Sequence, residues 1–108
     1  MELHIKDRIY IPQILPQQNS FMEYNLKREI IKKIVLTEKD KEEYAIVEDS
    51  QAAKITWDYA KDMNNPLIVD FSKQELEYLK KACESLIETA YPDDFWITVE
   101  KIYNAVNA

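Results

Sequence analysis

The chain contains no glycine among its 108 residues, and this absence restricts its turns and its chemistry more than any other feature. Glycine adopts positive φ without steric cost and lets the backbone approach a phosphate group closely. The P-loop, the dinucleotide-binding fingerprint and the nucleophile elbow all need glycines at fixed positions. The sequence therefore excludes these motifs, and we expect asparagine, aspartate and proline to make the turns.

The length and composition are typical of one small globular domain. Of the residues, 46% are hydrophobic, which is enough to build a single core but hardly two. We therefore predict a single domain over residues 1–108. No apolar run approaches the length of a membrane span, and charges interrupt the N-terminus where a signal peptide needs a continuous apolar stretch. These observations predict a cytoplasmic protein that makes no membrane contact.

Cysteine and histidine each occur once, as Cys83 and His4. One cysteine cannot form an intramolecular disulfide, and the spacings that hold zinc, such as Cys-x-x-Cys, do not occur. We interpret Cys83 as a small buried hydrophobe and His4 as a solvent-facing strand residue. The sequence predicts neither a metal site nor a cofactor.

Residues 3–11 alternate between apolar and polar side chains, which is the pattern of a half-buried strand that ends at Pro12. Shorter strands are predicted at residues 44–47, 54–59 and 67–71, and a turn is predicted at residues 61–66.

Helices are predicted where a capping residue precedes an apolar stripe with helical spacing. Asn19 or Ser20 can cap the first of these helices, and Ser20 has the spacing to Glu23 that a capping box requires. Ser72 with Glu75 predicts a second capping box, and Thr37 can cap a short charged helix. A last helix is predicted over residues 95–106. Strands and helices are partly segregated along the chain, which favours an α+β fold. We expect a small antiparallel sheet of three to four strands packed against two or three helices.

Several short motifs occur in a familiar order along nearly the whole chain: Ile14-Leu15-Pro16, Phe21, Leu36-Thr37-Glu38, Ile55-Thr56-Trp57, Phe71-Ser72 and Glu77-Tyr78-Leu79-Lys80-Lys81. In this order the chain resembles a group of small uncharacterised proteins encoded by bacteriophages, prophages and related mobile elements. The resemblance implies a phage or mobile-element setting. It implies no activity and assigns no catalytic residue.

Paired carboxylates are the only enzyme-like candidates, at Asp58–Asp62, Glu84–Glu88 and Asp93–Asp94. A catalytic pair needs one carboxyl group with a raised pKa in a desolvated cleft. We interpret all three pairs as solvated surface residues, and we predict that the protein is not an enzyme and has no small-molecule substrate.

Two clusters of charge suggest binding to a macromolecule. Four basic residues lie on one predicted helix, but the net charge of −6 argues against nucleic-acid binding, and we interpret them as a solvated face: Lys27, Arg28, Lys32 and Lys33. An acidic run from Glu38 to Glu43, with Glu48 and Asp49, could instead attract a basic protein surface over a distance.

Four large aromatic residues are the preferred functional candidates. Trp57 and Tyr59 share a face of a predicted strand, and Trp96 and Tyr103 share the flank of the last predicted helix. Such rings either fill a small core or remain half covered and anchor an interface. The sequence leaves this choice open.

The leading hypothesis is a non-catalytic protein, associated with a phage or mobile element, that acts through protein–protein contact. Its partner would be a second copy of itself, in a homo-oligomer, or a host or phage protein. The alternative hypothesis is an acidic decoy that inhibits a basic host nucleic-acid-binding protein.

Overall fold

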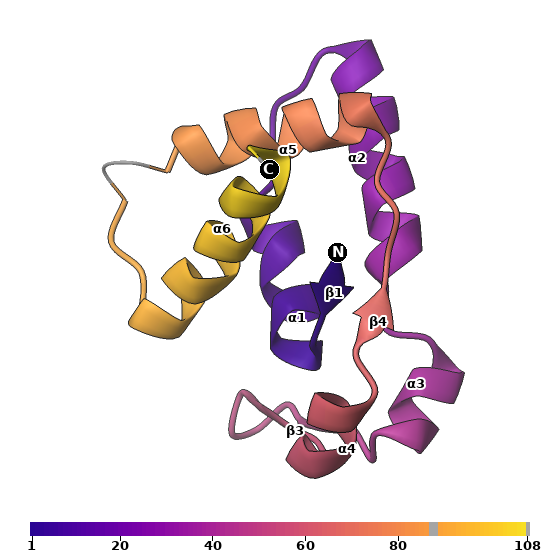
Figure 1. Cartoon of the computed structure of the whole chain (residues 1–108). Helices are drawn as coiled ribbons and strands as arrows, with labels where there is room; N and C mark the ends of the chain where they lie inside the picture. Colours follow the sequence, from indigo (N-terminus) through magenta and orange to yellow (C-terminus); the bar gives the residue numbers. More distant parts are fainter. Residues whose placement is uncertain (87–88, 108) are drawn as a thin grey trace.

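The computed structural model describes residues 1–86 and 89–107. Its fold is α+β, with helices dominating and the strands short (Figure 1). In chain order the elements are β1 Glu2–Leu3, α1 Ile5–Ile14, α2 Phe21–Ile34, α3 Glu38–Glu43, β2 Val47–Asp49, β3 Lys54–Thr56, α4 Tyr59–Asn64, β4 Leu67–Ile68, α5 Lys73–Glu84 and α6 Asp93–Val106.

The two predicted capping boxes are confirmed, and the predicted cap at Thr37 also proves to be a capping box, with Asp40. The hydroxyl of Ser20 accepts a hydrogen bond from the backbone N of Glu23 at 3.2 Å, and the Glu23 carboxylate accepts one from the backbone N of Ser20. Thr37 opens α3 and Ser72 opens α5 in the same reciprocal way. Each box satisfies two backbone N–H groups that have no partner within the helix, so the start of the helix is encoded locally.

The strand predicted at residues 3–11 is wrong. Only Leu3 and its neighbour Glu2 are in a strand, and the chain turns helical at Ile5. His4 therefore precedes a helix rather than lying on a strand, and it is half-buried. Pro12 lies inside α1, close to its end, where the missing N–H removes one hydrogen bond of the last turns.

The predicted sheet of three to four strands is also wrong for the part of the chain that the structure describes. The strands there form two separate antiparallel pairs, β1 with β4 and β2 with β3. The strand predicted at residues 54–59 ends at Thr56, and Tyr59 begins α4, which replaces the predicted turn. Asp58 starts this helix, since its carboxylate accepts a hydrogen bond from the backbone N of Lys61.

Two alanines take the left-handed conformation that glycine would normally supply. Ala45 has φ 51° and Ala53 has φ 50°. The expectation that asparagine, aspartate and proline make the turns is therefore incomplete. Ala53 lies in the loop between β2 and β3, where the Asp49 carboxylate accepts hydrogen bonds from the backbone N of Gln51 and of Ala52.

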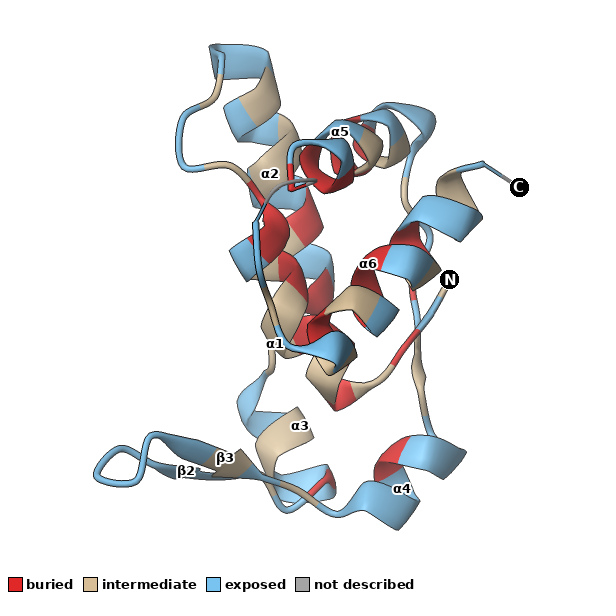
Figure 2. Ribbon diagram, turned by 90° about the vertical axis from the view of Figure 1, so that its left-hand side faces the viewer, coloured by how far each residue is buried: buried red, intermediate tan, exposed pale blue. Residues whose placement is uncertain are grey.

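The core lies where α1, α2, α5 and α6 meet (Figure 2). Most of the buried residues lie on these four helices, while α3, α4 and the β2–β3 hairpin extend to one side with little burial. Fully buried core residues include Ile11, Ile30, Leu79, Phe95 and Ile102. Among residues 1–86 and 89–107, none of the helices combines the length and apolar character needed to span a membrane.

Candidate functional site

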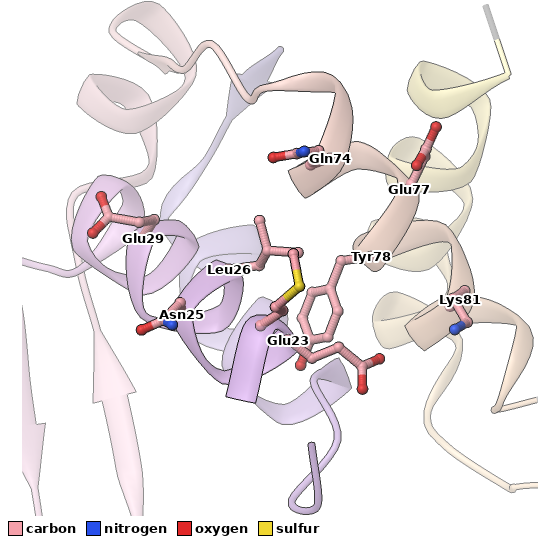
Figure 3. A pocket seen from close by; sticks show the side chains of 9 residues that line it. Glu23, Asn25, Leu26, Glu29, Gln74, Glu77, Tyr78 and Lys81 are labelled. Atoms are coloured by element: carbon pink, nitrogen blue, oxygen red, sulfur yellow. The ribbon is translucent and has the colours of Figure 1, made fainter. Parts of the chain in front are cut away.

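An open groove of about 430 Å³ lies between α2 and α5 (Figure 3). Each helix lines the groove with positions that repeat at helical spacing. On α2 these are Met22, Glu23, Asn25, Leu26 and Glu29, and on α5 they are Gln74, Glu77, Tyr78 and Lys81. Because residues three, four and seven apart lie on one side of a helix, the groove is bordered by two continuous helical faces.

The floor of the groove is apolar. Leu26 and Tyr78 point toward each other from the two helices, and Tyr78 is buried (Figure 3). The Tyr78 hydroxyl donates a hydrogen bond to Oδ1 of Asn19 at 2.5 Å, so the ring is held in place at its polar end. Burial raises the pKa of Tyr78, and the nearby Glu23 carboxylate adds to this rise. The phenol therefore stays neutral at physiological pH.

Two exposed apolar side chains lie at the N-terminal end of α2, and one of them, Met22, lines the groove. Phe21 is 78% exposed and Met22 is 73% exposed. Burying Met22 against a partner would remove apolar area from water, which is the main favourable term in protein association.

The rim of the groove is mainly acidic. The charged side chains that line the groove are three glutamates and one lysine: Glu23, Glu29, Glu77 and Lys81. Hydrogen bonds from Ser20 lower the pKa of Glu23, and the positive charge of Lys81 lowers it further. Three carboxylates against one ammonium group leave the rim with a net negative charge.

The aromatic pair Trp57 and Tyr59 lies outside this groove. The two rings are 4.9 Å apart between centroids, and Tyr59 is 62% exposed. Trp57 is half-buried, and its Nε1 is covered without a hydrogen-bond partner among the described residues. Met63, 65% exposed, lies in the same helix as Tyr59, so this end of the molecule also presents apolar surface.

The other pair, Trp96 and Tyr103, lies on α6. Trp96 is partly buried against the core, with its ring edge-on to Tyr91 and to Phe95 at centroid distances of 5.7 and 5.9 Å. Tyr103 is 38% exposed. No ring contact joins this pair to Trp57 and Tyr59 within the described ranges, so the structure does not bring the four together.

One member of the carboxylate pairs is buried, contrary to the sequence interpretation. Asp62 accepts a hydrogen bond from the backbone N of Ile5 at 3.0 Å, while Asp58 is exposed. Asp62 thus satisfies the start of α1 from 57 positions away. Of the other pairs, Asp93 and Glu84 are exposed, Asp94 is half-buried in contact with Lys6, and Glu88 lies outside the described residues.

A buried charge cluster joins α1 to α6. The Asp7 carboxylate accepts hydrogen bonds from the hydroxyl of Thr98 at 2.6 Å, from Nζ of Lys101 at 2.5 Å and from the backbone N of His4. Burial alone would raise the pKa of Asp7, but these hydrogen bonds outweigh it and hold the pKa below its ordinary value. A general acid needs the opposite shift, so this cluster is suited to holding two helices together.

Arg8 joins α1 to the α2–α3 connection. Its guanidinium donates to the carbonyl oxygens of Ile34 and Val35 and to Oδ2 of Asp40, at 2.7–2.8 Å. Asp40 also belongs to the Thr37 capping box, so one carboxylate serves both the helix start and this tertiary contact.

The basic residues of α2 are drawn into separate contacts within the protein. Lys27 donates to the carbonyl oxygen of Pro16, Arg28 lies over the ring of Tyr24, Lys32 pairs with Glu29, and Lys33 pairs with Glu75. These contacts spread the charges over several sides of the helix rather than gathering them into one phosphate-binding surface.

Metal-ligating and nucleophilic groups are sparse. Within residues 1–86 and 89–107, no three His, Cys, Asp or Glu side chains are grouped so as to hold a metal ion. Cys83 is buried, and burial raises the pKa of its thiol to about 11. The thiolate, which is the reactive form, is therefore scarce at physiological pH.

Comparisons with protein-family models, with curated proteins and with solved structures find no match for the chain. The resemblance to phage and mobile-element proteins accordingly stays a prediction.

Proposed function

We propose that the protein is a non-catalytic binding protein that contacts a partner protein through the groove between α2 and α5. The observation that carries this proposal is the combination of an apolar floor, Leu26 and Tyr78, with the highly exposed Met22 in the lining of the same groove. Exposed apolar side chains beside a concave surface are typical of protein-binding sites.

The chemistry of the acidic residues supports a non-catalytic role. Asp7 and Glu75 are buried, and their hydrogen bonds lower the pKa of each carboxyl group. Both remain charged and fully occupied at neutral pH. In the groove itself Tyr78 is the buried titratable group, whereas an acid–base mechanism needs two such groups with separated pKa values.

The acidic decoy is less well supported as an alternative. Glu38, Glu42 and Glu43 are exposed on α3, but Asp40 is already paired with Arg8. Exposed acids are also what solubility alone requires. Binding of a basic partner to the acidic residues of α3 is therefore a second outcome, which the experiments below distinguish from binding in the groove.

The test is a selection of random peptides displayed against the full chain. We expect enriched peptides to bind the wild-type protein and the variant Met63→Glu, and to lose binding to Met22→Glu. Both methionines are similarly exposed, at 65% and 73%, so the two variants place the same charge at matched surface positions. Enriched peptides that bind both variants equally, or an absence of enrichment, would contradict the proposal.

A further inference from the structure

The two helical faces of the groove determine what shape of ligand fits between them. From Met22 to Glu29 on α2, and from Gln74 to Lys81 on α5, each face covers two turns, or about 10 Å along its axis. Side chains repeating at three and four residues form ridges, and the grooves between ridges accept the same repeat from a third helix.

The groove lining offers no strand edge with which an extended peptide could pair, because both borders are helices. Backbone hydrogen bonding by strand addition therefore has no template here, and side-chain packing must supply the affinity. This favours a helical ligand that places apolar residues on one face.

The charge of the rim then selects among helical ligands. Glu77 is exposed and has no ion-pair partner among the described residues. Glu29 contacts Lys32 at 3.3 Å, but both side chains are more than half exposed, and such surface pairs are weak. Lysine or arginine residues beside the apolar face of a helical ligand could form ion pairs with the carboxylates of Glu29 and Glu77.

The same charges argue against a second copy of this chain as the occupant. A second copy would bring a rim with the same acidic excess to the groove, and the whole chain carries a net charge of −6. Like charges brought together in an interface oppose binding.

From these observations we infer that the groove binds a basic amphipathic helix of a partner protein. The helix is short, about two to three turns, because the faces that border the groove are no longer. Its apolar side chains occupy the space over Leu26 and Tyr78 and cover Met22, and its lysine or arginine residues lie along the Glu29–Glu77 side. This inference rests on the proposed function and adds the chemistry of the partner.

The test uses three fluorescent synthetic peptides of about 12 residues, long enough for roughly three helical turns. The first has leucines at helical spacing and lysines elsewhere; the second replaces the lysines with glutamates; the third scrambles the first so that its leucines no longer share a face. Binding to the full chain is measured by fluorescence anisotropy. We expect the first peptide to bind at least about tenfold more tightly than either of the others.

Variants on the protein side assign the binding to the groove. Met22→Glu should weaken the first peptide by about tenfold or more, while Met63→Glu should leave its affinity unchanged. Glu77→Lys should weaken binding of the first peptide and strengthen binding of the second. Glu100→Lys, the same change at an exposed position on α6, should alter neither preference by more than about twofold. Circular dichroism confirms that each variant is folded.

The outcomes separate this inference from the proposed function. If the glutamate peptide binds as well as the lysine peptide and Met22→Glu abolishes both, the groove is a binding site but the inferred basic partner is wrong. The scrambled peptide could instead bind as tightly as the first peptide, with an affinity that Met22→Glu does not change and that added salt abolishes. General attraction to acidic surface would then explain the binding, and the inference would be overturned. Failure of all three peptides to bind also overturns the inference, and the display selection then decides the proposed function independently.

Discussion

Nζ of Lys33 lies 2.6 Å from Oε1 of Glu75, and this ion pair joins the last turn of α2 to the first turn of α5. The same oxygen accepts a hydrogen bond from the backbone N of Ser72 at 2.7 Å. Glu75 is buried and Lys33 is about one-third exposed, at 4% and 35% of their side chains. One carboxylate therefore caps α5 and holds it against α2, which fixes the separation of the two helices that border the groove.

Removing this charge should destabilise the fold. Glu75→Gln keeps an acceptor for Ser72 but loses the charge-assisted bond to Lys33, and we expect the free energy of unfolding to fall by about 1–3 kcal/mol. Urea denaturation measures the change. Glu29→Gln is the matched control, because its pair with Lys32 is exposed and contributes less than about 0.5 kcal/mol. Equal losses in the two variants would show that the Lys33–Glu75 contact has no special role.

Acid should weaken the fold through three carboxylates. Burial by itself raises the pKa of Asp7, Asp40 and Glu75, but hydrogen bonds from Lys101, Arg8 and Lys33, respectively, together with neighbouring donors, leave each pKa below its ordinary value of 3.8 for aspartate or 4.5 for glutamate. A pKa that is lower in the folded state gives stability that is complete above the unfolded value and is lost as the pH falls through the folded value.

We therefore expect the stabilisation from these three carboxylates to stay constant from neutral pH down to about pH 5. The melting temperature of the protein should then fall steeply below about pH 4. Calorimetry across this range measures the effect. Asp7→Asn should lower stability at neutral pH and reduce the slope in acid, because one of the three linked protons is then absent. An acid slope identical to that of the wild-type protein would contradict the assignment of Asp7.

Glycine in place of an alanine with positive φ should stabilise the protein. A residue with a Cβ atom at positive φ costs about 1 kcal/mol relative to an unstrained backbone, and glycine removes this cost. Ala53→Gly should therefore raise the free energy of unfolding by roughly 0.5–1 kcal/mol. Ala52→Gly, next to it but without positive φ, should bring no gain. A stabilisation that is equal at both positions, or absent at Ala53, would count against strain in the hairpin loop.

The two aromatic residues of α6 should respond differently to truncation. Trp96 packs against Tyr91 and Phe95, so Trp96→Ala should lower the free energy of unfolding by roughly 2–4 kcal/mol. Tyr103 is more exposed, and Tyr103→Ala should cost less than about 1 kcal/mol. Thermal denaturation compares the two. A stability-neutral Trp96→Ala would instead favour Trp96 as an interface anchor.

The parts of the fold that were predictable from sequence are those whose signals are local. The capping boxes at Ser20, Thr37 and Ser72 place the donor, the acceptor and the helix within four residues of one another, and all three helices begin where predicted.

The first helix was missed because its support is distant in sequence. Asp7 interrupts the apolar face of a strand pattern, but its partner Lys101 lies 94 positions away, and Arg8 meets Asp40 across 32 positions. Local alternation could not show that both charges are buried. The burial of Asp62 was equally hidden in the sequence, because its hydrogen bond with Ile5 depends on tertiary structure.

The groove was only half visible in the sequence. Met22 and Leu26 lie four residues apart, so the sequence alone places both on one side of a helix. Tyr78, Glu77 and Lys81 carry no signal that would place them opposite that side. The site depends on how α5 packs against α2, and the Lys33–Glu75 contact that sets this packing spans 42 positions.

The measurement that tests the central claim most directly is a titration of the isotope-labelled full chain with the basic amphipathic peptide, followed by backbone amide NMR. The account predicts chemical-shift changes concentrated in residues 21–29 and 74–81, which form the two faces of the groove. Changes confined to the acidic residues of α3 and the β2–β3 hairpin, or to α6, would contradict it.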